Sequence, residues 1–227
     1  MSDKTKKVRP IRAAVSGLIW FLCLVSVSVV LTLNFRPLYY ADMKLLDIST
    51  KSGYSDEIIK ENYDVLIDYN NIWYDGNLEF PDFPMSDEAR IHFEEVKNVF
   101  AIFEYGAVVL LPISLIIFVF SKRRQKCIAA ASAAAYSIGT LLAAAILIIQ
   151  NWELVFVTFH KLVFKNDYWI FDPVTDPVIL ILPDAFFMHC AVLIIFFILL
   201  GSAVFFGTWR KLKKRLRNVK AAAETVG

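Results

Sequence analysis

Four long apolar runs dominate the pattern of hydrophobic and polar positions along this 227-residue chain. They cover residues 13–33, 101–121, 128–150 and 184–209. Each run has about the 20 apolar residues that a helix needs to cross the hydrocarbon core of a bilayer. A backbone exposed to lipid must satisfy its own hydrogen bonds, so all four runs are predicted to be helices. The pattern therefore predicts a membrane protein with an all-α core of four transmembrane helices.

Composition and charge give this membrane core an orientation. Hydrophobic residues make up 57% of the chain and charged residues 20%, against about 45–50% and 25% in soluble domains. Lys and Arg gather in residues 1–12, in the loop at 122–127 and in the tail at 210–227. Because such residues favour the cytoplasmic side, both termini and this loop are predicted to be cytoplasmic. The basic clusters indicate topology and contacts with anionic phospholipid, not a nucleic-acid surface.

The first outward segment, residues 34–100, carries signals for a small folded domain. Ser55 is placed to cap an amphipathic helix whose apolar residues recur at helical spacing through Ile67. The Asp75-Gly76 step then lies between two short β-prone pieces, a pattern that favours a hairpin. A small extracellular α/β domain is therefore expected.

A continuous helix is predicted from Asp87 into the second membrane span. Ser86 precedes it as an N-cap, and no Gly or Pro interrupts the sequence before Gly106. His92 lies on the part of this helix that comes before the apolar run. At about 1.5 Å per residue, that part projects above the bilayer.

The second outward segment, residues 151–183, contains another histidine, His160. A helical pattern runs over residues 151–164, and two Asp-Pro steps then favour an extended return to the fourth span. The second and third spans are joined by a short loop, so they are antiparallel neighbours. Their outer ends would then let His92 and His160 converge.

Two further features lie inside the spans. His189, in the fourth span, is expected to be a packing or hydrogen-bonding residue. The Ala-rich stretch at 129–135 is predicted to form a close helix contact within the chain, with a homodimer seam as the alternative.

The chemistry that the sequence offers is limited. It contains no GxSxG elbow, no HExxH pair and no Gly-rich phosphate loop. The lack of a candidate Ser or Cys nucleophile indicates either a binding protein or an enzyme whose substrate carries its own nucleophile. Two histidines suit the second case, because an unperturbed pKa of about 6.5 lets one ring accept and another donate a proton.

Two stretches carry a resemblance to a known family. The first is IHFEEVK at residues 91–97, which follows Glu88 and contains His92. The second comprises Phe159, His160, Phe164, Asn166, Asp167, Trp169, Asp172, Pro173 and Asp176. With four spans and both ends inside, the chain resembles the bacterial lipoprotein intramolecular transacylases, integral membrane proteins of Gram-positive bacteria.

This resemblance implies a reaction within one substrate molecule. The sn-2 acyl chain of a diacylglyceryl-modified N-terminal cysteine would move to that cysteine's own α-amino group, giving a lyso-form lipoprotein. The expected partners are diacylglyceryl-modified lipoproteins and membrane phospholipid, with the chain acting as a monomer in the cell membrane. Its active site would face the extracellular side, and no cofactor or metal is expected.

The expected catalytic pair is His92 and His160 as general acid and base. His160 is favoured as the base, and the reversed roles are the alternative. By chemistry alone, the candidate donors to a developing oxyanion are Lys97, Lys161, Asn166 and Trp169. The candidates to orient a histidine ring are Asp167, Asp172 and Asp176, and N-capping and solvation are the alternative for each.

Two other functions stay open from the sequence. One is a non-enzymatic membrane accessory or binding protein in which the histidines are structural. The other is a metal-dependent membrane hydrolase, with His92, Glu95 and His160 as ligands.

Overall fold

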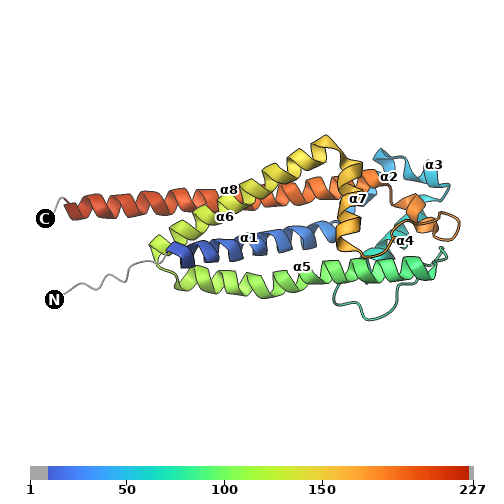
Figure 1. The fold of residues 1–227 in the computed structure, drawn as a ribbon, viewed down its shortest axis with the longest axis horizontal. Helices are drawn as coiled ribbons and strands as arrows, with labels where there is room; N and C mark the ends of the chain where they lie inside the picture. The colour runs from blue at the N-terminus through green and yellow to red at the C-terminus, as the bar shows by residue number, and fades with distance from the viewer. Residues whose placement is uncertain (1–9, 225–227) are drawn as a thin grey trace. The chain divides into compact units, whose positions relative to one another are not determined.

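The computed structural model describes residues 10–224 and builds them from helices and connecting loops (Figure 1). The elements are α1 (Pro10–Leu33), α2 (Arg36–Leu45), α3 (Ile48–Ser52), α4 (Asp56–Tyr69), α5 (Asp87–Phe120), α6 (Arg123–Gln150), α7 (Trp152–Val163), the 3-10 helix η1 (Pro177–Ile181) and α8 (Asp184–Glu224). The predictions for residues 1–9, in the basic N-terminal segment, and for residues 225–227, at the end of the tail, lie outside the described residues.

Four of these helices, α1, α5, α6 and α8, are long and apolar enough to cross a membrane. This confirms the four predicted membrane helices and makes the chain a multi-pass membrane protein. At 34 and 41 residues, α5 and α8 are longer than the about 20 residues that a span requires. Both therefore extend beyond the hydrocarbon core.

The chain divides into two compact units, each described here by itself. Of the described residues, the first unit holds 10–26, 106–143 and 196–224, and the second holds 27–105 and 144–195.

Close packing of small residues characterises the first unit. Ala129, Ala130 and Ala133 are buried in one cluster with Trp20. A Cβ atom built on Gly17 would lie 2.6 Å from the Ala129 carbonyl oxygen, so only glycine allows α1 to approach α6 this closely. The Ala-rich stretch thus makes a helix contact within the chain, as predicted.

The second unit has a core of aromatic and aliphatic side chains from α2, α4, η1 and the start of α8. The rings of Tyr39 and Tyr63 stack with their centroids 3.6 Å apart, and Phe186 lies edge-on to both. The Tyr39 hydroxyl donates to the Ile181 carbonyl at 2.7 Å, which joins α2 to η1. Because this phenol is fully buried, the bond satisfies a polar group that would otherwise cost free energy.

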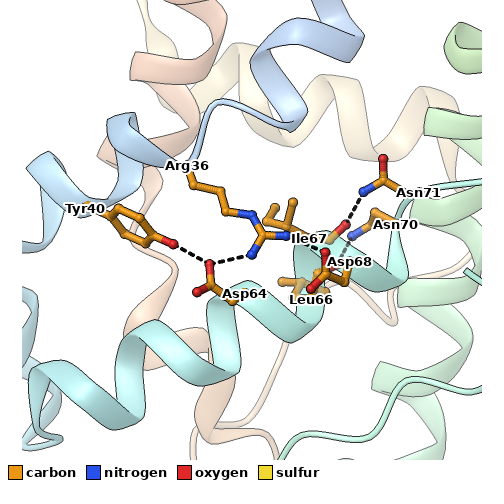
Figure 2. Close-up of polar contacts among 8 residues, drawn as sticks. All are labelled: Arg36, Tyr40, Asp64, Leu66, Ile67, Asp68, Asn70 and Asn71. Atoms are coloured by element: carbon orange, nitrogen blue, oxygen red, sulfur yellow. Dashed lines mark hydrogen bonds and ion pairs between the residues drawn. The ribbon is translucent and has the colours of Figure 1, made fainter.

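A polar network fastens α2 to α4 in the same unit (Figure 2). Arg36 forms ion pairs with Asp64, at 2.9 Å, and with Asp68. The Tyr40 hydroxyl donates to the same Asp64 carboxylate at 2.6 Å. One carboxylate therefore holds two side chains that come from successive turns of α2.

Side chains define both ends of α4, and the sequence predicted its start correctly. The Ser55 hydroxyl accepts a hydrogen bond from the Ile58 N–H at 3.4 Å, as an N-cap does. At the other end, the side-chain amides of Asn70 and Asn71 each donate to a carbonyl of the last turn at 2.8 Å (Figure 2). These bonds supply side-chain donors to carbonyls of the last turn, where the helix runs out of backbone donors, and the helix ends there.

The expected extracellular α/β domain is wrong, because residues 10–224 contain helices and no strand. The Asp-Gly step that favoured a hairpin lies in an irregular loop at residues 71–85. Side chains of α5 bind this loop: Glu104 accepts from the Ile72 N–H at 2.9 Å, and Lys97 Nζ donates to the Tyr74 carbonyl at 3.1 Å. These partners replace the ladder bonds of a hairpin, so the loop is ordered without strand pairing.

Candidate active site

The N-terminal end of α5, which carries His92, is fixed by Asp176. The Asp176 carboxylate accepts hydrogen bonds from the Ser86 N–H at 2.7 Å and from the Ser86 hydroxyl at 2.9 Å. Ser86 Oγ in turn accepts from the Ala89 N–H at 3.1 Å and so caps α5, as predicted. Asp176 is 3% exposed, and its negative charge faces the positive end of the helix dipole. This anchor fixes the start of α5 and therefore the position of the helix turn that carries His92.

The helix that carries His160 is separate from the third span. The third span ends with α6 at Gln150, and α7 begins as a separate helix that turns sharply away from it (Figure 1). The Asn151 side chain accepts from the Leu154 N–H at 2.9 Å and caps the new helix. The break therefore follows from an N-cap that the apolar pattern concealed.

The His160 ring is held in one tautomer by its own helix. His160 Nδ1 lies 2.7 Å from the Phe156 carbonyl oxygen. Because a carbonyl oxygen only accepts hydrogen bonds, Nδ1 carries the hydrogen and Nε2 keeps its lone pair. Burial of the ring lowers the pKa of His160 below the ordinary value of 6.5, against the smaller opposing effects of this hydrogen bond and of Asp184. The ring is thus a neutral base at neutral pH.

The structure brings His92 and His160 together, with ring centroids 6.0 Å apart. Aromatic rings enclose the pair. Phe164 and Phe171 lie 4.8 and 5.5 Å from the His92 ring, and Phe156 and Trp169 lie 4.2 and 4.7 Å from the His160 ring. Two imidazolium ions at this separation would repel each other in such apolar surroundings, so the pair favours holding at most one proton.

Three buried polar atoms at this site have no hydrogen-bond partner within residues 10–224: His92 Nδ1, Trp169 Nε1 and Glu95 Oε2. Buried polar groups in proteins are normally satisfied. The three atoms comprise an imidazole nitrogen, a donor and a carboxylate oxygen, so the site can offer all three to polar groups of a bound molecule.

Beside the histidines, a cavity of about 300 Å³ opens between α5 and the end of α7. Its lining includes Glu95, Val99 and Ile102 from α5, and Val163, Phe164 and Lys165 from the other wall. Asn166 Nδ2 donates to Glu95 Oε1 at 3.0 Å, which links the two walls. Phe164 both lines the cavity and contacts the two histidine rings, so the cavity adjoins the pair.

The other predicted site residues lie in different surroundings. Lys97 binds the Tyr74 carbonyl and lies 4.4 Å from the Tyr69 ring centroid, while Lys161 and Asp167 are exposed. Asp172 accepts from the backbone of its own turn at 2.9 Å. Across the described residues, none of these four side chains makes a hydrogen bond or ion pair with either histidine, and neither does Asp176.

Sequence reasoning missed the partner of His189. His189 Nδ1 lies 2.9 Å from both carboxylate oxygens of Asp42, which is 2% exposed. Asp42 follows Tyr39 by one helical turn and precedes Met43, and all three are buried. An acid on the apolar face of an amphipathic helix was the signal that would have identified it.

The described residues contain no group of three or more His, Cys, Asp or Glu side chains that could hold a metal ion. Glu95 therefore does not complete a ligand set with His92 and His160, and the metal-site alternative has no supporting geometry in this part of the chain.

The fold and this site define a multi-pass membrane protein with a pair of buried histidines in an aromatic enclosure. Comparison with known families gives the class a name: the sequence model of the lipoprotein intramolecular transacylase Lit family matches residues 14–187. The chain belongs to this family of lipoprotein intramolecular transacylases. Comparison with curated proteins finds no match.

Solved structures agree with this assignment. The membrane integral lipoprotein intramolecular transacylase Lit from Bacillus cereus is 35% identical, with a TM-score of 0.86 over 92% of this chain and 97% of that one. Two variants of the same protein, with one histidine replaced by arginine or by alanine, are 32% and 33% identical with TM-scores of 0.77. Both matches cover 92% of this chain. They cover 94% of the arginine variant and 95% of the alanine variant.

Proposed function

We propose that this protein moves the sn-2 acyl chain of a diacylglyceryl-modified N-terminal cysteine to the α-amino group of the same cysteine. The product is a lyso-form lipoprotein. Family membership supports the reaction class, and the observation that carries the proposal is the buried histidine pair, with His160 held as a neutral base 6.0 Å from His92.

Such a reaction needs no nucleophile from the protein. The amine that attacks and the ester that is attacked belong to one substrate molecule, so the protein must orient them and move protons. Orientation of tethered groups removes most of the entropic cost of bringing them together. The aromatic enclosure suits this task because it restricts the substrate and excludes water.

The proton transfers balance across the pair. The amine nitrogen bonds to the ester carbonyl carbon, and its proton passes to His160 Nε2. The bond from that carbon to the sn-2 glycerol oxygen then breaks as this proton passes from His160, through His92, to the departing oxygen. The pair thus never holds more than one added proton, and both rings end neutral, as they began. The reversed assignment of base and acid is the alternative.

Among the candidate oxyanion donors, Trp169 is best placed. Its Nε1–H is buried without a partner in the described chain, and its ring lies 4.7 Å from that of His160. Asn166 already donates to Glu95, and Lys97 already donates to the Tyr74 carbonyl. Lys161 is exposed. A donor that is buried and free stabilises a developing oxyanion more than one screened by water.

The proposed topology places this site at the outer surface of the cell membrane. Lys and Arg flank the cytoplasmic ends of the spans, in residues 1–12, 122–127 and 210–227. Residues 34–100 and 151–183 are then extracellular, where a lipoprotein anchored in the outer leaflet presents its ester and amine. The protein acts as a monomer among membrane phospholipids, and the basic clusters contact anionic headgroups.

The test is mass spectrometry of the N-terminal peptide of a lipoprotein co-expressed with this protein. Wild type should give the lyso form with an N-acyl chain. His160→Asn keeps an amide nitrogen near the position of Nδ1, and so the bond to Phe156, but it removes Nε2. It should lower the rate by about 10²–10⁴-fold.

Thr158→Ala, an exposed change on the same helix, is the matched control and should behave as wild type. If wild type and control both reach the membrane and yield no lyso form, the transacylase function is refuted. The accessory or binding protein then becomes the better explanation of the fold.

A further inference from the structure

We propose that the Glu95 carboxylate binds the α-amino group of the substrate's N-terminal cysteine and presents it to the histidine pair. This inference rests on the proposed function, because it names the group that receives the nucleophile of that reaction. Glu95 is thus a substrate-binding residue, distinct from the two proton-transferring histidines.

The position of Glu95 supports this role. It lies on α5 three residues after His92, a spacing that places both side chains on one face of the helix. The adjoining Phe164 ring lines the same cavity as Glu95 and contacts His92 at 4.8 Å. A group bound by the carboxylate would therefore be close to the ring that handles protons.

The carboxylate is held, yet half of its bonding capacity is unused. Asn166 Nδ2 donates to Oε1 at 3.0 Å and fixes the side chain. Oε2 is buried and has no hydrogen-bond partner among the residues described. Each carboxylate oxygen has two lone pairs, so Oε1 also keeps one after the bond from Asn166, and Glu95 can accept a further bond from a group in the cavity that it lines. A purely structural carboxylate would be expected to have both oxygens bonded.

The chemistry of the substrate matches this acceptor. A free α-amino group has a pKa of about 7.7–8.0 and is largely protonated at neutral pH. A carboxylate only accepts hydrogen bonds, and those from a cation are the stronger kind. The ammonium gives one proton to solvent before it reacts. The nitrogen becomes positive again as it attacks the ester carbonyl, before its second proton leaves to His160 and on to the departing oxygen. Glu95 would stabilise the amine both on binding and in the transition state.

Binding of two unreactive lipopeptides to the full-length protein in nanodiscs tests the proposal. Both carry ether-linked chains on the cysteine, and one has a free α-amine while the other is N-acetylated. Wild type should bind the free amine about 10–100 times more tightly, as a charge-assisted hydrogen bond predicts. Glu95→Gln keeps an oxygen for Asn166 and removes the charge, so the ratio should fall to about one.

Glu94→Gln is the matched control, because Glu94 is the exposed neighbour on the same helix. It should keep the wild-type ratio. A Glu95→Gln protein that keeps the preference for the free amine would overturn the proposal, as would a wild type without that preference. If Glu95→Gln also loses affinity for the acetylated probe, the Glu95→Asp variant is measured as well. It keeps the carboxylate and should keep the preference for the free amine. Loss of that preference in Glu95→Asp overturns the proposal.

Failure of the proposed function would look different. In that case wild type gives no lyso form by mass spectrometry, whatever the binding ratio. A ratio that depends on Glu95 in such a protein would support an amine-binding site without transacylation.

Discussion

The anchor between Asp176 and the start of α5 yields the sharpest prediction about how the fold positions the site. Replacing Asp176 by Ala removes three hydrogen bonds to a buried carboxylate, two from Ser86 at 2.7 and 2.9 Å and one from the Thr175 hydroxyl at 2.8 Å. Bonds to a charged group contribute about 1.5–3 kcal/mol each, but such values are not additive. Water can replace some of the lost partners, so we expect the free energy of unfolding to fall by about 3 kcal/mol. That lowers the melting temperature by about 6–12 °C for a domain of this size.

The assay is a double-mutant cycle of thermal unfolding in detergent with Ser86→Ala, which by itself should cost about 1 kcal/mol as the loss of an N-cap. Because the two residues share bonds, the double variant should lose about 1 kcal/mol less than the sum of the two single losses. Asp176→Ala should also lower transacylation more than the loss of folded protein explains, since it releases the helix end that positions His92. Strict additivity, within about 0.5 kcal/mol, would refute the shared anchor.

Three further predictions follow from single contacts. In NMR of ¹⁵N-histidine-labelled protein, the ring of His160, assigned with His160→Asn, should titrate below pH 6.5, because burial penalises the imidazolium and keeps the ring neutral as the pH falls toward the lowered pKa; a midpoint at or above 6.5 would contradict this. Asp42→Ala should destabilise the protein by about 2–3 kcal/mol in thermal unfolding, below the about 3–5 kcal/mol for breaking a fully buried pair, because the side chain of His189 keeps 27% exposure; an unchanged melting temperature would show that the pair is not formed. Gly17→Ala should lower the melting temperature by several degrees, since its Cβ would meet a backbone carbonyl of α6 at 2.6 Å, whereas Gly139→Ala, with no atom within 4 Å, should be neutral or stabilising; equal effects would refute the close contact.

Local signals explain why much of the fold could be predicted. The four membrane helices follow from the length of the apolar runs, which no other spanning structure satisfies. The starts of α4 and α5 follow from Ser55 and Ser86, because an N-cap acts on the backbone of its own helix. In each case the decisive interaction lies within a few residues of the signal.

The elements that the sequence did not predict depend on distant partners. The loop at 71–85 has the local chemistry of a hairpin, but Glu104, more than thirty residues away, takes the Ile72 N–H. Asp42 forms its contact with His189, which is 147 positions further along the chain. Competition between a local pattern and a tertiary partner is settled by packing, which a single sequence does not display.

The candidate site shows the same division. His92 and His160 could be selected because histidines are rare here and both were predicted to lie beyond the apolar runs, at ends of neighbouring helices. The several acids of the second outward segment could not be sorted by chemistry alone. In the structure Asp172 accepts from the backbone of its own turn, and Asp176 accepts from Ser86, the N-cap of α5. Their contacts are with backbone groups and hydroxyls, which leave no distinctive pattern in a sequence.

The arrangement explains how such a small set of polar atoms could suffice for acyl transfer. The proposed reaction makes three demands: a base and an acid for one proton, a site for the amine, and a donor for the oxyanion. His160 is the neutral base, and the site has one buried atom without a hydrogen-bond partner in the described chain for each of the other needs. These atoms are His92 Nδ1 for the acid, Glu95 Oε2 for the amine and Trp169 Nε1 for the oxyanion. Other polar side chains nearby are committed to helix ends and turns, where they hold the rings in place. Because the substrate brings both reacting groups, a protein that fixes these three atoms around it needs no covalent chemistry of its own.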